Sequence, residues 1–593
     1  MFNTSTESVP IVQIAKSWIR QCSAHAACQL YPGSSFVPTR LIYIGSSNKS
    51  VVKLIETLES PRSNQPQYMA LSHCWSDEAG AVLTTANHKS MRDRIPVESL
   101  SRSFGDAISF TRALGVRYLW IESLCVLQDS PEDWARESVL MMNVFSNAMC
   151  TIATSSISHS EDECIPDRFD ELSSCTLISS KRKRLQMTSG RPRPFLKDLF
   201  GTRGGLMPFT DRAWVFQERL LSHRVIHFYS NAMLFECNTI QASDTNVDGC
   251  RYENVPYILL KEETQNSSLL SGQKRSGSIK GKWKRVNVTD AEELDHKVLG
   301  NLSRDEVKDH TATRGIRSIL DAILLFNAES DLSLKQKLDF NKQWYKLVSL
   351  YSGMRLKRQS DKLIAIAGIA RLVEKSTSAS YKAGLWDNVL PEFGLLWRAM
   401  SLARGQSSYC APSWSWASAG CDVSLLPFIH PGEVDAIFHA HIQRLVSTFK
   451  GEAVQSAASH VDGGFMEITG LVTKVYASQI PNMLCFHRGE ASEDIDYFPD
   501  RYDYIADSLI APPEPAHGIS DLSQVQLTAL LVLSSPGQDG ILWNADGLIL
   551  RPKPNLQSPG AFERIGAFRF QGLKSYLQRA TTEGWTQQAI RLY

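Results

Sequence analysis

The chain has 593 residues, of which 43% are hydrophobic and 21% are charged, and its formal net charge is +1. These values are ordinary for globular proteins, and so small a net charge excludes a global field that would attract nucleic acid or an acidic membrane surface. The first residues, MFNTSTESVPIVQ, lack the pattern of a signal peptide, and no run of about 18 apolar residues predicts a membrane span. We therefore expect a cytoplasmic protein whose twelve cysteines are mostly reduced thiols.

Residues 1–57 are predicted to be a lead-in to the first folded domain. The segment IVQIAKSWIRQC has helical spacing of its apolar residues, whereas RLIYIG and VVKLIETL are typical of short strands. At the end of the helical segment, Cys22, His25 and Cys28 offer two thiolates and one imidazole. Three such groups without a second cluster indicate a metal site only weakly, so we interpret the cysteines as small buried thiols and assign no metal ligand.

Residues 58–240 alternate between strand and helix patterns. The predicted strands are YMALSHCW (68–75), RYLWIESLCVL (117–127) and CTIATSS (150–156), and the predicted helices cover residues 99–115 and 131–148. This alternation is typical of a parallel sheet with covering helices. After a polar stretch, residues 211–237 predict one more helix followed by two strands.

The basic run KRKR (181–184) lies in that polar stretch. We interpret it as a solvated loop, with a nuclear address as the alternative. Beyond the first domain, residues 241–312 are poor in apolar residues and predict a flexible insert. Residues 313–408 have helical spacing, and residues 409–593 predict a β-rich C-terminal domain.

Familiar motifs for nucleotide and metal chemistry are missing from the sequence. It contains no G-x-x-x-x-G-K-[ST] loop, no G-x-G-x-x-G after a strand, no H-E-x-x-H and no G-x-S-x-G elbow. The sequence therefore predicts neither a nucleotide-driven switch nor zinc catalysis nor a serine hydrolase, and it predicts no cofactor.

The predicted helix 131–148 carries a carboxylate on its apolar side. At about 100° per residue, Glu137 falls in the same sector as Met141, Val144 and Phe145. Buried carboxylates are usually paired, so an ion pair is one interpretation, with Arg212 as a partner for Glu137 or Glu122. A catalytic carboxylate and an error in the helical phase are the alternatives.

Four segments together resemble the signature blocks of the fungal heterokaryon incompatibility (HET) domain and its full-length members. These blocks are YMALSHCW (68–75), SFGDAISFTRALGVRYLWIESLCVLQDSPEDWARESVLMMNVFSNAMCTIA (103–153), DRAWVFQERLLSHRVIHF (211–228) and YCAPSWSWAS (409–418). The chain departs from the pattern at Glu122, where the family more often has Asp, which moves the carboxylate outward by one methylene.

The resemblance implies a role in fungal non-self recognition, in which the HET domain is the effector of programmed cell death. It also implies a fold similar to the TIR domain, a flavodoxin-like α/β unit. Activation would involve self-association or another incompatibility protein as partner. A non-catalytic scaffold or regulator, for example one linked to secondary metabolism, is the alternative from a different functional class.

Several TIR domains cleave NAD with a glutamate near a Trp-Cys-x-x-Glu sequence, and DWARE (133–137) places Trp134 and Glu137 at a similar spacing. The resemblance thus makes NAD a candidate substrate, with Glu137 as its central carboxylate. A carboxylate shielded from water can stabilise an oxocarbenium-like ribose.

The other predicted site residues follow from their places on the predicted sheet. Ser72 and Glu122 lie near the carboxyl ends of parallel strands, where α/β sheets bind ligands, and Glu122 is the second candidate catalytic residue. Trp75 and Trp134 offer rings that could stack on the nicotinamide or adenine. Arg212, Gln217 and Glu218 are expected to form a structural polar network.

Overall fold

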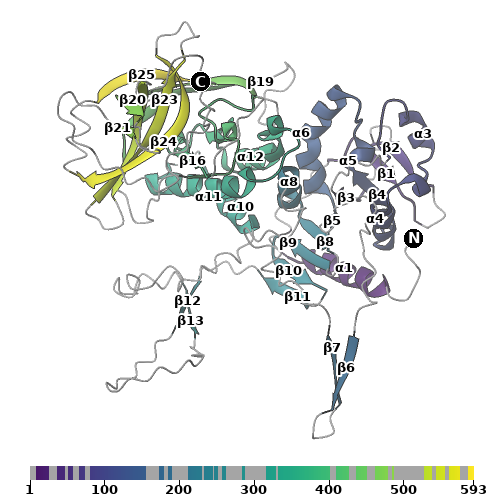
Figure 1. The fold of residues 1–593 in the computed structure, drawn as a ribbon. Helices are drawn as coiled ribbons and strands as arrows, with labels where there is room; N and C mark the ends of the chain where they lie inside the picture. Colours follow the sequence, from purple (N-terminus) through teal and green to yellow (C-terminus); the bar gives the residue numbers. More distant parts are fainter. Residues whose placement is uncertain are drawn as a thin grey trace, which may run out of the picture.

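The structure of the protein is a computed structural model with three successive regions (Figure 1). It describes residues 8–25, 28, 36–46, 51–57, 66–73, 81–154, 173–178, 184–189, 212–229, 233–244, 246–251, 257–261, 283–287, 316–328, 331–400, 409–425, 436–449, 461–477, 484–485, 526–536, 542–553, 560–574 and 585–593. An N-terminal α/β region is followed by a helical region and then by a β-rich region, which confirms the predicted order of structural classes.

One nine-stranded sheet organises the α/β region, in the order β11-β10-β9-β8-β5-β3-β4-β1-β2. Its strands are β1 (Arg40–Tyr43), β2 (Lys53–Glu56), β3 (Tyr68–Ser72), β4 (Tyr118–Ile121), β5 (Cys150–Thr154), β8 (Arg224–Phe228), β9 (Met233–Cys237), β10 (Ile240–Ser243) and β11 (Asn246–Arg251). The four central strands, β4, β3, β5 and β8, run parallel to one another. Antiparallel strands flank them on both sides.

The sheet is therefore mixed, which corrects the prediction of a parallel sheet. Short turns connect β8 to β11 in sequence, and such turns join antiparallel neighbours, whereas parallel strands need a long crossover. The sheet also reaches further along the chain than the predicted boundaries of 58–240. Strands β1 and β2 come from the predicted lead-in, and β11 comes from the predicted insert.

Helices pack on this sheet through aromatic side chains. They are α1 (Ser8–Cys22), α3 (His88–Asp93), α4 (Arg102–Ala113), α5 (Glu122–Cys125), α6 (Pro131–Asn147) and α8 (Ala213–Leu221). Phe110 of α4 meets Phe228 of β8 edge to face, with ring centroids 5.1 Å apart. Phe145 of α6 meets Trp120 of β4 in the same way at 5.5 Å. The central strands β3 and β5 are buried along their whole length, as expected when both faces of a sheet are covered.

The start of α6 is fixed by its sequence. Ser130 is the N-cap, and its side chain accepts a hydrogen bond from the backbone N–H of Asp133 at 3.2 Å. Pro131 occupies the first turn, where a missing N–H costs nothing. This cap places Asp133 and Glu137 one turn apart on the buried side of α6.

Two small hairpins precede the helical region. Strands β6 (Ser173–Ile178) and β7 (Arg184–Ser189) pair with each other, as do β12 (Tyr257–Lys261) and β13 (Trp283–Asn287). The first three residues of the KRKR run lie outside the described residues, and Arg184 begins β7. The rest of the predicted insert beyond β11 also lies outside them, except for β12 and β13.

The helical region contains α10 (Ile316–Leu324), α11 (Leu334–Ser352), α12 (Ile364–Thr377) and α13 (Pro391–Gly394). The Pro-Ser-Trp-Ser-Trp block follows, and Trp414 and Trp416 are fully buried. Trp416 donates its indole N–H to the backbone carbonyl of Gly384 at 3.1 Å. Gly384 lies in the turn between β14 (Tyr381–Lys382) and β15 (Leu385–Trp386), which pair with each other, and β16 (Trp397–Ala399) pairs with β17 (Val423–Leu425).

The C-terminal region is an eight-stranded antiparallel-rich sheet. Its strands are β18 (Ile437–Phe438), β19 (Ala440–Phe449), β20 (Val461–Ala477), β21 (Leu484–Cys485), β22 (Gln526–Pro536), β23 (Leu542–Pro552), β24 (Ala561–Leu573) and β25 (Thr586–Leu592). Because β20 pairs with both β22 and β25, five of these strands close into a ring, β20-β22-β23-β24-β25. Closure leaves those five strands without a free edge, which protects them from pairing with other chains.

Among the helices that the structure describes, we find none long and apolar enough to cross a membrane.

Candidate functional site

Polar side chains gather where the parallel strands end. Ser72 is the last residue of β3, Thr154 is the last of β5, and Glu122 directly follows β4. Glu218, on α8, points to the same edge, because its carboxylate accepts a hydrogen bond from the Ser72 hydroxyl. We call Ser72, Glu122, Thr154, Arg212 and Glu218 the carboxyl-edge cluster. Ligands of open α/β sheets bind at such an edge.

Glu218 carries a strongly perturbed carboxyl group in this cluster. Its residue is only 7% exposed, and burial raises the pKa of the carboxyl to about 7, with the nearby negative charge of Glu122 adding to the effect. The hydrogen bond from Ser72 and the charge of Arg212 act in the opposite direction. A carboxyl group with a pKa near 7 exists in both protonation states at neutral pH, which suits general acid–base catalysis.

Arg212 is held at the start of α8 by two segments of the chain. Its guanidinium donates to the backbone carbonyl of His73 at 2.8 Å. The backbone beside it pairs with Arg355 of the helical region, where the N–H of Ala213 donates to the carbonyl of Arg355 at 3.1 Å. Arg212 thus brings a fixed positive charge to the carboxyl edge. Burial and this charge together lower the pKa of the His73 imidazole to about 4, so His73 is neutral at pH 7.

Glu137 is buried, as the helical phase predicts, at 4% exposure. Its partner is not Arg212: Arg136 donates to its carboxylate at 3.4 Å, and Thr39 and Arg40 lie close enough to stabilise its charge. Burial outweighs these contacts and raises the pKa of the Glu137 carboxyl above its ordinary value. Of the two predicted partners of Arg212, Glu137 is therefore wrong, because the cations near Glu137 come from α6 itself and from β1.

A buried ion pair that the sequence did not indicate lies beside Glu137. The guanidinium of Arg40 binds both carboxylate oxygens of Asp133, at 2.8 and 2.9 Å, and also donates to Glu56 at 3.0 Å. Asp133 further accepts from the N–H of Leu127 at 2.9 Å. Asp133 and Arg40 are 93 residues apart in the sequence, so no local signal could have revealed the pair.

The remaining predicted residues lie in different places. Trp134 is half-buried and meets Trp214 edge to face at 6.4 Å, whereas Trp75 lies outside the described residues. Gln217 faces the helical region rather than the carboxyl-edge cluster, because its side-chain oxygen accepts from the backbone N–H of Gly368 at 2.7 Å. The predicted residues thus separate into two groups, with Ser72, Glu122, Arg212 and Glu218 at the sheet edge and Glu137 with the Arg40–Asp133 pair.

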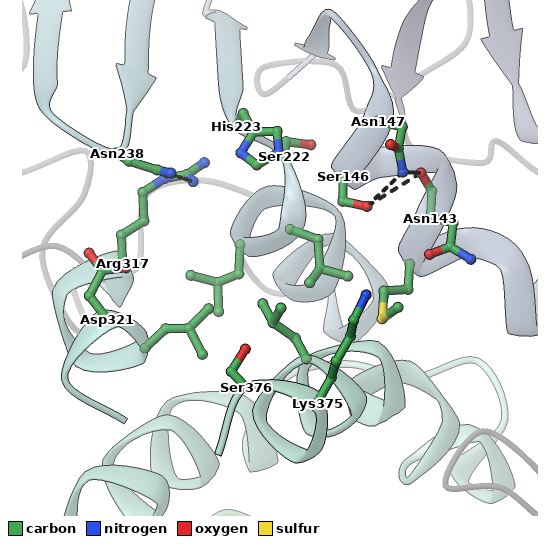
Figure 2. Close-up of a pocket in the computed structure, with 15 residues that line it drawn as sticks. Asn143, Ser146, Asn147, Ser222, His223, Asn238, Arg317, Asp321, Lys375 and Ser376 are labelled. Carbon is green, nitrogen blue, oxygen red and sulfur yellow. Dashed lines mark hydrogen bonds between the residues drawn. The ribbon is translucent and has the colours of Figure 1, made fainter. Parts of the chain in front are cut away.

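A cavity of about 340 Å³ lies elsewhere, between α6, α8, α10 and α12 (Figure 2). It is near the amino ends of the parallel strands, since His223 directly precedes β8. Figure 2 shows Arg317, Asp321 and Lys375 on its walls with several aliphatic side chains. Burial, aided by the charges of Arg317 and Arg224, lowers the pKa of His223 to about 4. None of the predicted site residues lines this cavity.

The fold and the site define an α/β domain whose polar cluster lies at the carboxyl ends of its parallel strands. Residues 68–218 match the model of the family described as heterokaryon incompatibility protein (HET). The chain therefore carries a HET domain, which confirms the resemblance seen in the sequence, and the matched segment includes every member of the carboxyl-edge cluster. No curated protein and no solved structure matches the chain.

Proposed function

We propose that this chain is an effector of heterokaryon incompatibility that triggers cell death after fungal cells of different genotype fuse. The observation that carries the proposal is the HET match over residues 68–218, which begins with β3 and ends at the buried carboxyl group of Glu218. Activation by self-association or by another incompatibility protein belongs to the same proposal.

NAD cleavage is the second candidate function, and the topology of the sheet favours it. The parallel strands lie in the spatial order β4-β3-β5-β8, which is second, first, third and fourth along the chain. Flavodoxin-like sheets share this order and bind their ligand between the first and third strands. Here those strands are β3 and β5, which end at Ser72 and Thr154, and the Thr154 hydroxyl donates to the Ser72 carbonyl at 3.4 Å.

The chemistry of NAD hydrolysis suits this edge. The bond between the ribose C1′ and the nicotinamide nitrogen breaks, the electron pair stays on nicotinamide, and water adds to C1′ and loses a proton. Ionised Glu218 would accept that proton or stabilise the positive charge that develops on the ribose. The guanidinium of Arg212 would bind the pyrophosphate. Glu137 is the alternative carboxylate, and its own raised pKa keeps it in competition with Glu218.

Two assays separate these functions. Regulated expression of the chain in a fungal host should arrest growth, and purified full-length protein should release nicotinamide from NAD. We expect Glu218→Gln to abolish the release of nicotinamide from NAD and Glu137→Gln to leave most of it. Glu132→Gln is the control, because Glu132 is an exposed carboxylate on the same helix as Glu137.

Each outcome has a defined meaning. If Glu137→Gln loses NAD turnover and Glu218→Gln does not, then Glu137 on α6, and not Glu218, is the catalytic carboxylate. Growth arrest without NAD turnover would leave the effector proposal standing and remove the enzymatic one. Normal growth with constant NAD levels would reject the effector proposal in favour of a non-catalytic scaffold or regulator.

A further inference from the structure

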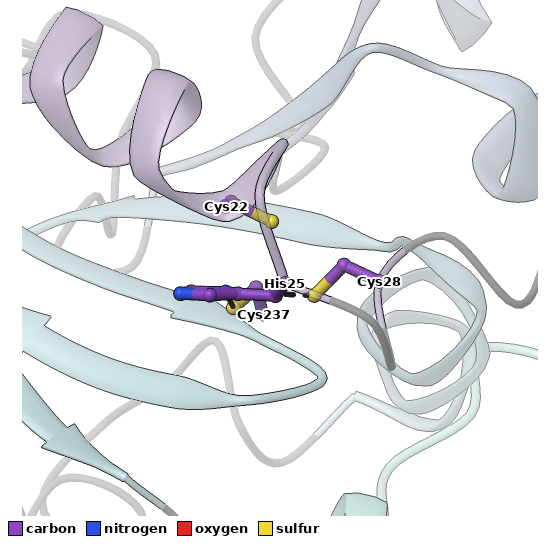
Figure 3. Close-up of side chains that lie close together, drawn as sticks. All are labelled: Cys22, His25, Cys28 and Cys237. Carbon is purple, nitrogen blue, oxygen red and sulfur yellow. Dashed lines mark hydrogen bonds between the residues drawn. The ribbon is translucent and has the colours of Figure 1, made fainter.

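Three thiols and one imidazole converge at the C-terminal end of β9, an inner strand of the nine-stranded sheet (Figure 3). Cys22 ends α1, His25 and Cys28 follow it closely, and Cys237 is the last residue of β9. The four candidate ligand atoms all lie within 4.8 Å of one another. We propose that Cys22, His25, Cys28 and Cys237 bind one Zn²⁺ ion as a structural site.

The distances between these atoms suit tetrahedral coordination. Nδ1 of His25 lies 3.5 Å from the sulfur of Cys237 and 3.8 Å from the sulfur of Cys28. With Zn–S and Zn–N bonds of about 2.3 and 2.05 Å, the edges of a tetrahedron are about 3.6 Å from sulfur to nitrogen and about 3.8 Å from sulfur to sulfur. The side chains therefore need little movement to close around the ion.

The surroundings of the sulfurs suit thiolates rather than thiols. The backbone N–H groups of Thr239 and Ile240 both point at the sulfur of Cys237 from 3.4 Å. The hydroxyl of Thr239 lies 3.5 Å from the sulfur of Cys28, and the guanidinium of Arg224 donates to the sulfur of Cys22 at 3.1 Å. Each of the three sulfurs thus has its own hydrogen-bonding partner, as the ligands of a metal site usually do.

Charge and burial agree with zinc. Three thiolates and one Zn²⁺ carry a net charge of −1, and Arg224 supplies the compensating positive charge beside Cys22. The three cysteines are buried and His25 is partly exposed. Soft sulfur ligands with one imidazole in a tetrahedral arrangement select zinc, and four protein ligands leave no open position for catalysis.

The ion would fasten the N-terminal helix to the sheet. Trp18 of α1 already stacks on Phe235 of β9 at 5.5 Å and donates its indole N–H to the carbonyl of Val247 at 2.8 Å. A metal bound by Cys22 at one end and Cys237 at the other would lock this contact. Metal binding would then contribute directly to the stability of this part of the fold.

The test is the metal content of the purified full-length protein, measured by inductively coupled plasma mass spectrometry. We expect one zinc per chain in the wild type, less than a tenth of that in Cys237→Ser, and an unchanged amount in Cys125→Ser. Cys125 is the matched control because it is a similarly buried cysteine of the α/β region, at the end of α5, and is not one of the four clustered residues.

A second variant guards against simple misfolding of Cys237→Ser. His25→Cys keeps four ligands, so it should retain one zinc, and after exchange with Co²⁺ its thiolate-to-metal absorption should be stronger than that of the wild type. A chelator should lower the melting temperature of the wild type and of Cys125→Ser. Wild-type protein without zinc, equal zinc in Cys237→Ser, or a disulfide between any two of the three cysteines would overturn the proposal.

Discussion

Replacing Glu218 with glutamine should make the α/β region more stable at pH 8 and leave it nearly unchanged at pH 4.5. The carboxyl group of Glu218 has a pKa of about 7 in the fold against an ordinary value of 4.5, chiefly because it is buried. Between these two values the folded chain holds a proton that the unfolded chain has lost. The stability of the wild type therefore falls as the pH rises through this window, and the loss is complete above about pH 7.

The size of the effect follows from the same two values. At about 1.4 kcal/mol per pH unit, the difference amounts to roughly 3 kcal/mol. Glutamine has nearly the same shape and can accept the hydrogen bond from Ser72, but it has no proton to lose. At roughly 2–4 °C per kcal/mol for a domain of this size, the melting temperature of Glu218→Gln relative to wild type should rise by roughly 6–12 °C between pH 4.5 and 8.

The measurement is a series of thermal unfolding curves of full-length wild type and Glu218→Gln at matched pH values. Taking the difference between the two proteins at each pH removes the contribution of all other titrating groups. Glu132→Gln serves as the control, since an exposed carboxylate should show no such trend. If the difference between Glu218→Gln and wild type does not change with pH, then Glu218 is ionised in the fold with an ordinary pKa, and the reasoning about its environment is wrong.

Four other substitutions have expected outcomes that thermal unfolding can check. Arg40→Ala leaves the Asp133 carboxylate buried without its bidentate partner, and it should lower the free energy of unfolding by roughly 3–5 kcal/mol. Arg94→Ala removes only an exposed ion pair, so it should lower the free energy of unfolding by less than about 1 kcal/mol. Equal effects of the two substitutions would contradict the role assigned to Arg40. Gly384→Ala should lower the free energy of unfolding by roughly 1–3 kcal/mol or more. Gly384 has a φ of +111°, and an added Cβ would lie 2.8 Å from side-chain atoms of Ser415 and Trp416. Gly105→Ala, inside α4 with open space around it, should instead stabilise by roughly 0.5–1 kcal/mol, and a loss of stability there would show that α4 is packed more tightly than described.

The sequence indicated which positions are buried better than it indicated their partners. Helical phase correctly placed Glu137 inside, and the ends of predicted strands correctly placed Ser72 and Glu122 at one sheet edge. The first inference uses helical periodicity and the second uses the ends of predicted strands, and both report the place of a side chain relative to its own element. Periodicity carries no information about the element that lies opposite, and so the pairing of Ser72 with Glu218 could not be read from it.

The same limit explains the other missed contacts. Asp133 and Arg40 are 93 residues apart in the sequence, and Cys237 joins Cys22, His25 and Cys28 from more than 200 residues further along the chain. The mixed character of the sheet was missed because strand patterns are alike in parallel and antiparallel neighbours, and only the short connections after β8 distinguish them.

Neighbouring residues of α8 contact different parts of the molecule, and this links those parts mechanically. Gln217 accepts from the backbone of Gly368 in α12, while Glu218 accepts from Ser72 at the end of β3. The two helices approach closely at this point, since a Cβ on Gly368 would lie 2.6 Å from the Gln217 oxygen. If a protein that binds α12 displaced this helix, α8 would therefore move with it. The movement would alter the hydration of the Glu218 carboxyl group, which exchanges its proton near neutral pH. In this way the helical region could change the pKa of Glu218 in the HET domain without contacting Glu218 itself.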